Sequence, residues 1–450
     1  MRAGHRENIR KFYFIGIGGV SMSALAKYLL ARGFEVSGSD MAAGERTEEL
    51  ISLGVRVSVG SDAENPCLSE ADEVVYTSAV SDDNAELSAA RRAGKLVRKR
   101  SELLGEICGD FSHVVAVAGS HGKTTCTAMC AHVLKETGVR FAAHIGGEDC
   151  EFGNFYMNGS DFFVTEACEY KKNLLDIRSD RAILLNIDRD HMECYRDLDE
   201  LVETFRNYCE GAELAFVCAD DERCRNLGDF STFGIDAADA DYHAVDLRQT
   251  GERYSFTVAE YGKALCRIRL NAAGRCNVYN ALAAFAAMRG YGFDEREIVR
   301  GLETFTAVKR RFECIGSYGG ASFICDYAHH PREIAATIAT AEGMCRGRLY
   351  AVFQPHTYSR TKLLMEDFVK ALRPVKNLMI YKTYPAREYF DEAGSAKTLA
   401  RNVGNCLYAE SVRELRTWLK ATLQPGDIAL FLGAGDIYYA ARYLLRELNK

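Results

Sequence analysis

The residues from Gly119 to Thr125 carry the clearest chemical signal in the chain. They read Gly-Ser-His-Gly-Lys-Thr-Thr, follow an apolar stretch from His113 to Ala118, and lead into a helical pattern. Glycines let backbone N–H groups approach phosphate oxygens, and the helix N-terminus attracts negative charge. Lys123 adds a cation for the β- and γ-phosphates, and the Thr124 hydroxyl can contact Mg²⁺. The full motif has a glycine where this chain has Val117, so the pattern predicts a shortened phosphate loop.

A second glycine-marked turn lies near the N-terminus. Gly16-Ile17-Gly18-Gly19 follows an apolar stretch, but Ser21 stands where the dinucleotide-binding pattern has its third glycine. Asp40 ends the next apolar stretch, where a ribose-binding carboxylate is expected. The turn favours a nucleotide diphosphate or a dinucleotide without deciding between them, and a packing turn is the alternative.

Acidic residues and a histidine follow two further apolar stretches. Glu166 and Glu169 come after the first, and Asp188, Asp190 and His191 come after the second. Because the carboxyl ends of parallel strands share one edge of a sheet, these groups could meet the phosphate loop and hold Mg²⁺ there. Solvated loop acids are the alternative.

The last third of the chain offers basic groups after its own strands. Asp326 to Pro331 follows one apolar stretch, and His356 and Arg360 follow the next. Lys309-Arg310-Arg311 lies near a predicted domain boundary. Arginine suits bidentate binding of carboxylate or phosphate, although each of these groups could belong to an ordinary loop.

The elements that must position these residues alternate between strands and helices. Three segments each begin with an apolar strand, a pattern typical of parallel sheets covered by helices. Met22, Leu25, Ala26 and Leu29, for example, recur at the spacing of one helix face. We predict three α/β domains: a Rossmann-like domain at 1–107, a central phosphate-loop domain with a mostly parallel sheet at 108–308, and a Rossmann-like domain at 309–450.

The composition limits the class of protein. The net charge is −7, which argues against nucleic acid as a partner. The N-terminus lacks the apolar core of a signal peptide, and no stretch approaches the roughly 18 apolar residues of a membrane span. The 16 cysteines are scattered, with no C-x-x-C pair, which favours reduced, mostly buried thiols. We therefore expect a cytoplasmic protein without membrane insertion.

Taken together, these motifs resemble the Mur ligase family from about Phe12 to Tyr438. The matching pieces, in chain order, are Gly-Ile-Gly-Gly at 16–19, Gly-Ser-Asp at 38–40, Thr-Ser-Ala at 77–79, the 119–125 loop, Glu166, Asn186-Ile187 with Asp190-His191, Asn277 to Ala284, Lys-Arg-Arg-Phe-Glu at 309–313, Asp326 to Pro331, and Gln354 to Thr361.

The resemblance implies a role for each matched position. It implies a UDP-sugar site at Gly18, Gly19, Ser21, Ser39, Asp40, Ser78 and Ala79. It implies an ATP site at Gly119, Ser120, His121, Gly122, Lys123, Thr124, Thr125, Asn277, Asn280, Arg311 and Asp326. It implies a metal site at Thr124, Glu166 and His191, and an amino-acid site at His329, His356 and Arg360. The catalytic groups it implies are Lys123, His191, His329, Arg310 and Arg311.

The implied reaction is ATP-dependent amide formation with Mg²⁺. The lactyl carboxylate of UDP-N-acetylmuramate would be activated as an acyl phosphate and then attacked by L-alanine, in an enzyme that is a monomer or a homodimer. A ligase that attaches a whole peptide during cell-wall recycling is the first alternative. An NAD-dependent oxidoreductase and a non-catalytic UDP-sugar or muropeptide sensor are more distant ones.

Several positions depart from the family pattern. Ser21 and Ala24 replace frequent glycines, and Cys168 replaces an aspartate. Cys276 stands where histidine is common, and Thr357 stands where arginine is frequent. These departures bear on the fit of the substrate and leave Lys123, Thr124, Glu166 and His191 in place.

Overall fold

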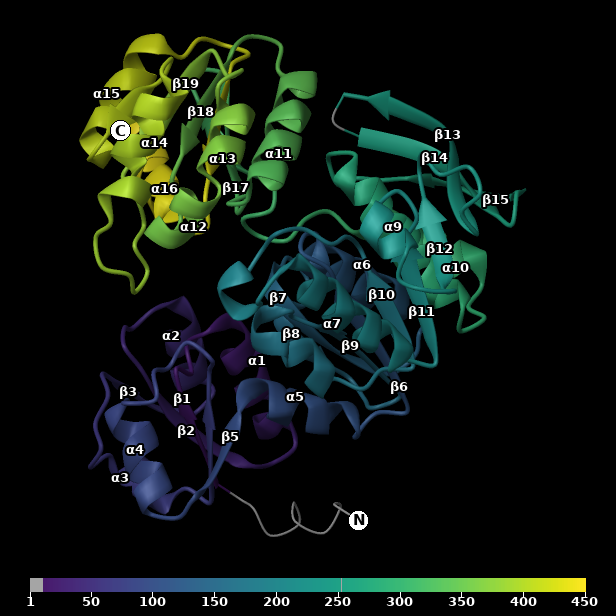
Figure 1. Cartoon of the computed structure of the whole chain (residues 1–450), viewed down its shortest axis with the longest axis vertical. Helices are drawn as coiled ribbons and strands as arrows, with labels where there is room; N and C mark the ends of the chain where they lie inside the picture. The colour runs from purple at the N-terminus through teal and green to yellow at the C-terminus, as the bar shows by residue number, and fades with distance from the viewer. Residues whose placement is uncertain (1–10, 252) are drawn as a thin grey trace. The chain divides into compact units, whose positions relative to one another are not determined.

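The computed structural model describes residues 11–251 and 253–450 (Figure 1). Its strands form three sheets of five, ten and six strands, each combined with helices. The predicted three-domain α/β class is confirmed, while the boundaries at 107 and 308 stay predictions. The chain packs into two compact units: one comprises residues up to Val245, Thr257–Ile268 and Tyr279–Phe305, and the other comprises Asp246–Phe256, Arg269–Val278 and Thr306–Lys450.

The N-terminal sheet is parallel, with the strand order β3-β2-β1-β4-β5. Its central strand is apolar and buried, which is expected when helices cover both faces. Met22, Leu25, Ala26 and Leu29 of α1 are buried, as their spacing predicts. The elements are β1 (Lys11–Ile15), α1 (Val20–Ala31), β2 (Glu35–Asp40), α2 (Glu45–Ser52), β3 (Arg56–Val59), α3 (Pro66–Glu70), β4 (Glu73–Tyr76), α4 (Ala85–Arg92), β5 (Leu96–Lys99) and α5 (Arg100–Cys108).

The central sheet has the order β15-β14-β13-β12-β11-β10-β6-β9-β7-β8. Strand β6 lies between β9 and β10 and is parallel to both, with Val117 beside Glu166 and Ala118 beside Leu184. The loops after these three strands therefore share one edge, as the sequence predicts.

The elements of this region are β6 (His113–Ala118), α6 (Lys123–Glu136), β7 (Phe141–Asp149), β8 (Gly153–Met157), β9 (Phe162–Glu166), η1 (Tyr170–Asp176), β10 (Arg181–Leu184), η2 (Met192–Cys194), α7 (Leu198–Glu210), β11 (Leu214–Cys218), α8 (Glu222–Arg225), β12 (Ser231–Gly234), β13 (Tyr242–Thr250), β14 (Arg253–Glu260), β15 (Lys263–Arg269), α9 (Cys276–Arg289) and α10 (Glu295–Thr304).

The C-terminal sheet has the order β16-β17-β21-β18-β19-β20 and is parallel except for the β16–β17 pair. Alternate residues of β17 face opposite cores: Ile324 packs with α11, α13 and α14, whereas Phe323 packs with α15 and α16. The elements are β16 (Glu313–Tyr318), β17 (Ala321–Asp326), α11 (Pro331–Met344), β18 (Leu349–Phe353), α12 (Tyr358–Leu363), α13 (Met365–Leu372), β19 (Asn377–Tyr381), η3 (Glu392–Gly394), α14 (Ala396–Val403), β20 (Leu407–Ala409), α15 (Val412–Thr422), β21 (Ile428–Leu432) and α16 (Ile437–Leu448).

The cysteines are free thiols. All 16 lie in the described part of the chain and none forms a disulfide, but only 7 are fully buried. The expectation of reduced thiols stays a prediction, and the expectation that most are buried is wrong, because many lie at the edges of the sheets and helices. No helix within the described ranges combines the length and the apolar character that a membrane crossing requires.

Close packing of α10 on α6 supports the helix that follows the phosphate loop. A Cβ atom at Gly301 would lie 2.4 Å from the backbone Cα of Val133. We expect Gly301→Ala to lower the free energy of unfolding by about 1–3 kcal/mol, because the two backbones must separate. The thermal midpoint should fall by about 2–4 °C for each kcal/mol. Gly44→Ala is the matched control, since nothing lies within 4 Å of its Cβ position; equal midpoints for the two variants would contradict the prediction.

Candidate active site

The phosphate loop connects β6 to α6 through two glycines in left-handed backbone conformations. Gly119 has φ +133° and Gly122 has φ +89°, values that residues with a side chain rarely adopt. A Cβ at Gly122 would also lie 2.6 Å from Oδ1 of Asn280 on α9. Both glycines are therefore required by local geometry, and Asn280 lies against the loop.

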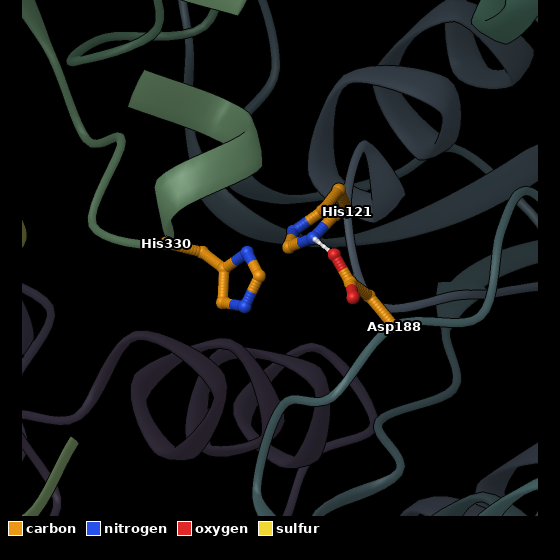
Figure 2. Close-up of side chains that lie close together, drawn as sticks. All are labelled: His121, Asp188 and His330. Carbon is orange, nitrogen blue, oxygen red and sulfur yellow. Dashed lines mark hydrogen bonds and ion pairs between the residues drawn. The ribbon is translucent and has the colours of Figure 1, made fainter. Parts of the chain in front are cut away.

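The segment after β10 holds this loop in place. The Asn186 side chain accepts a hydrogen bond from the His121 N–H at 2.8 Å and donates one to the His121 carbonyl at 3.0 Å. The Ser120 hydroxyl accepts from the Asp188 N–H at 2.8 Å. Figure 2 shows the His121 ring beside the Asp188 carboxylate, with 3.1 Å between Nε2 and Oδ2. His121 thus braces the loop through its side chain.

The Lys123 ammonium lies inside the loop, paired with a buried carboxylate. Its Nζ is 2.9 and 3.1 Å from the two Glu169 oxygens and also donates to the Gly119 and Ser120 carbonyls. The Glu169 side chain is 1% exposed. Burial would lower the pKa of Lys123, but the Glu169 carboxylate outweighs it and raises that pKa. Lys123 is therefore a fixed cation.

A candidate metal site includes the Glu169 carboxylate. Oxygen or nitrogen atoms of Glu169, Asp190 and His191 lie within 4.8 Å of one another. Burial lowers the pKa of His191, but Glu193 and the carboxylates of Asp190 and Glu169 outweigh it, so this pKa is raised. Two buried carboxylates and an imidazole form a donor set that can hold a divalent cation.

The predicted metal ligands are only partly brought together. His191 is in the cluster, whereas the Glu166 carboxylate accepts a hydrogen bond from the Gly146 N–H at 2.6 Å. Thr124 is buried in the first turn of α6. The metal roles of Thr124 and Glu166 stay predictions. Sequence reasoning noticed Glu169 and Asp190 as acids but did not select them, although Asp190 directly precedes His191.

The N-terminal glycine turn is organised by its own acid. Asp40 Oδ2 accepts from the Gly18 N–H at 2.8 Å, and Arg46 donates to the Gly18 carbonyl. Ser39 is buried and its hydroxyl donates to Glu86 at 2.6 Å. These side-chain hydrogen bonds of Asp40 and Ser39 therefore stabilise the domain.

The remaining predicted UDP-sugar residues lie around the ends of β1 and β4. Thr77 packs against Gly16, since a Cβ atom at Gly16 would lie 2.8 Å from the Thr77 methyl group. Ser78 and Ala79 follow Thr77 directly, and Gly19 is the N-cap of α1. The UDP-sugar roles of this group stay predictions.

Ser21 connects this turn to the central sheet. Its hydroxyl is 2.8 Å from Nε2 of His144 on β7, and His144 Nδ1 is 2.9 Å from the hydroxyl of Thr165 on β9. His144 is buried, and desolvation together with the nearby Arg100 charge lowers its pKa to about 3. The serine that replaces a glycine is thus part of a hydrogen-bonded junction with a neutral histidine.

The two arginines before β16 differ in their surroundings. Arg310 donates to the Ala434 and Gly435 carbonyls, and its guanidinium lies over the rings of Tyr327 and Tyr438. Arg311 lies 4.9 Å from the Tyr327 ring centroid. Arg310 is therefore held by its own domain, and Arg311 is the better candidate for contact with a ligand.

Asp326, at the end of β17, orders the backbone beside these arginines. Its carboxylate accepts from the Phe312 and Ala328 N–H groups, both at 2.7 Å. Burial raises its pKa to about 6, partly offset by Arg311. The predicted ribose contact of Asp326 and the adenine contact of Asn277, which lies on α9, stay predictions.

The predicted amino-acid residues do lie together. The rings of His329 and His356 are 6.0 Å apart, and Arg360 Nη1 is 3.4 Å from His356 Nδ1. Thr357, which follows His356, has φ +67° and is the N-cap of α12. Two strand ends thus place two imidazoles and a guanidinium side by side.

Comparison with known proteins identifies the family of this chain. The chain matches models of the Mur ligase family catalytic domain at 11–112, the Mur ligase middle domain at 117–288, and the Mur ligase glutamate ligase domain at 310–435. It is 36% identical to a UDP-N-acetylmuramate–L-alanine ligase of Clostridium tetani, with 97% of this chain and 98% of that protein covered. The chain belongs to the Mur ligase family.

Solved structures of two other Mur ligases have the same fold. A UDP-N-acetylmuramate–alanine ligase from Thermotoga maritima superposes with a TM-score of 0.85 at 29% identity, covering 98% of this chain and 99% of that one. A murein peptide ligase from Psychrobacter arcticus gives a TM-score of 0.75 at 22% identity, covering 98% and 99%. The second shares the fold only.

Removing the Lys123 side chain should reduce turnover strongly while the protein still folds. We expect Lys123→Ala to lower kcat by about 10²–10³-fold, the effect of losing one preorganised group that faces developing charge. ADP release measured alongside circular dichroism separates activity from folding. Lys135→Ala on the same helix, whose side chain is 47% exposed, is the control. Full activity of Lys123→Ala would contradict the assignment of the phosphate loop.

The buried His144 should make the protein sensitive to acid. Its pKa is lowered from 6.5 to about 3, so only the unfolded chain binds this proton at intermediate pH. The contribution of neutral His144 to the free energy of unfolding is complete above pH ~6.5. It is lost as the pH falls toward ~3, by at most about 1.4 kcal/mol for each pH unit. Thermal midpoints between pH 7 and 4.5 should fall less for His144→Gln than for the unmodified chain. A comparable flattening in His113→Gln, where the side chain is 47% exposed, would mean that burial of His144 is not the cause.

Proposed function

We propose that this Mur ligase joins L-alanine to UDP-N-acetylmuramate, with ATP converted to ADP and phosphate, in peptidoglycan precursor synthesis. The observation that carries the proposal is 36% identity over 97% of the chain to a relative of that name. The paired Lys123 and Glu169 at the phosphate loop support it. Since ATP and a sugar nucleotide are its substrates, we propose a cytoplasmic enzyme, either a monomer or a homodimer.

The reaction needs two transfers and no side-chain nucleophile. The lactyl carboxylate attacks the γ-phosphorus, the bond to the β–γ bridging oxygen breaks, and ADP leaves. The amine of L-alanine, having lost a proton, attacks the acyl carbon of the acyl phosphate, and inorganic phosphate leaves as the amide forms. Catalysis depends on positioning and on neutralising charge as it develops.

Lys123 and the helix N-terminus behind it have the chemistry for the first transfer. The ammonium would exchange Glu169 for phosphate oxygens, and the N–H groups of Gly122 and Lys123 would bind the same oxygens. Arg311 would add a second cation to the transferred group. Ser120, His121 and Thr125 would complete the loop around the phosphates.

Mg²⁺ fits the donors beside the loop. Glu169, Asp190 and His191 would hold it, directly or through water, with Thr124 and Glu166 as further candidates. When bound, it would neutralise charge on the phosphate oxygens. With His191 neutral, as a metal ligand must be, two carboxylates against one ammonium leave net negative charge in the cluster, which favours a divalent cation.

The acceptor would bind at His329, His356 and Arg360. A guanidinium can hold the alanine carboxylate through two parallel hydrogen bonds. An imidazole is a suitable base for the ammonium, and His329 and His191 are the candidates. His329 Nδ1 donates a hydrogen bond to the Tyr327 carbonyl at 3.0 Å, which fixes the orientation of its ring.

The test is ADP release from purified protein with Mg²⁺-ATP and UDP-N-acetylmuramate. We expect release with L-alanine that exceeds release with glycine or L-serine, and none with a tripeptide. Reactions without UDP-N-acetylmuramate are the control for background hydrolysis. Release with the tripeptide alone would move the assignment to a recycling ligase, and no release with any acceptor would refute the ligase function.

A further inference from the structure

Arg100 is an arginine of the N-terminal region for which the reaction above has no role. It is the first residue of α5 and is half-buried. Its Nη1 donates to the Ser21 hydroxyl at 3.0 Å. Ser21 lies in the first turn of α1, directly after the glycine turn, and joins that turn to His144. Arg100 therefore lies at the junction between the glycine turn and the central sheet.

The guanidinium of Arg100 lacks a carboxylate partner among residues 11–251 and 253–450. The hydrogen bond to Ser21 occupies Nη1, and no ion pair is formed within those ranges. Arg98, two residues earlier, is the opposite case, because it is bonded to the carboxylates of both Glu73 and Glu106. The same short segment thus contains one arginine whose charge is neutralised and one whose charge is not.

The surroundings make this unpaired charge costly. Desolvation lowers the pKa of Arg100, although Cys168, Glu166 and Asp176 oppose the shift from longer range. Glu166 already accepts a hydrogen bond from the Gly146 N–H. A partly desolvated cation with unused N–H donors is stabilised when an anion binds, and a guanidinium can offer such an anion two parallel donors.

The position of Arg100 selects the chemistry of the anion. On one side is the glycine turn, which favours a nucleotide diphosphate. On the other side, the chain of hydrogen bonds from Ser21 through His144 reaches Thr165, the neighbour of Glu166 at the phosphate-loop edge. A sugar nucleotide that spans these two sites carries oxyanions along that path.

We propose that Arg100 is a substrate-binding residue that holds an oxyanion of the sugar nucleotide, with Ser21 orienting its guanidinium. The oxyanion is either the diphosphate or the lactyl carboxylate. The inference rests on the proposed function, since that function supplies the sugar nucleotide.

The test is calorimetric titration of the full-length protein with UDP-N-acetylmuramate and with UDP-N-acetylglucosamine, which lacks the lactyl carboxylate. We expect Arg100→Gln to weaken binding of UDP-N-acetylmuramate by about 10–100-fold, the usual effect of losing a charge-assisted hydrogen bond. An equal loss for both ligands identifies the diphosphate, and a loss confined to UDP-N-acetylmuramate identifies the carboxylate. Lys99→Gln, which removes the adjacent exposed charge, should bind both as the unmodified chain does.

Thermal unfolding of each variant separates binding from folding. Unchanged affinity of a folded Arg100→Gln variant would overturn the inference, while failure of the unmodified chain to bind UDP-N-acetylmuramate would instead refute the proposed function. If Arg100→Gln does not fold, the affinity of the Arg100→Lys variant for UDP-N-acetylmuramate tests the inference instead. This variant keeps the charge but loses the second parallel donor, so we expect weaker binding by at least about threefold, and equal affinity would overturn the inference.

Discussion

The buried ion pair between Lys123 and Glu169 sets the charge balance on which the phosphate-loop edge depends. Glu169 is almost fully enclosed, and an enclosed carboxylate is costly unless a cation and hydrogen bonds compensate it. Asp190 and His191 adjoin the same oxygens, so removing the ammonium would leave an excess of negative charge. A nucleotide that draws Lys123 toward its phosphates therefore creates the need for another cation beside Glu169. Under the proposed function, binding of ATP would for this electrostatic reason favour binding of a divalent metal.

Ser21 shows how a departure from a family pattern can have a structural cause. A glycine at this position would leave His144 without its Nε2 partner, in a place where the imidazole is neutral and enclosed. Buried polar atoms without partners are destabilising, so the hydroxyl and the imidazole depend on each other. The departure therefore supplies a contact between the glycine turn and the central strands, and it places a side chain close to the proposed nucleotide site.

The features that were predicted best from the sequence are those controlled by local backbone geometry. The strands, the left-handed glycines of the phosphate loop and the helix after it follow from nearby residues, as does the shared edge of parallel strands. Which of Glu166 and Glu169 lies with Asp190 and His191 does not follow from local sequence. Glu166 faces Gly146 because β7 lies beside β9, a pairing of strands that the sequence order does not reveal. Arg310 and Arg311 are likewise adjacent in sequence, and a tyrosine more than a hundred residues away distinguishes them.

Four cations of the chain can be ordered by what already neutralises or fixes them. Arg98 has two carboxylate partners, and Arg310 is fixed by two carbonyls and two aromatic rings, so a ligand would have to replace strong contacts. Lys123 has one carboxylate partner that a metal can also bind, which makes exchange feasible. Arg100 has a hydroxyl partner alone within the described residues, and its charge is the least compensated. Desolvation makes such a charge unfavourable in the free protein and favourable once an anion arrives. An anionic substrate therefore gains most free energy by binding at the cations whose charge is least compensated, and these need not lie in the most basic segments.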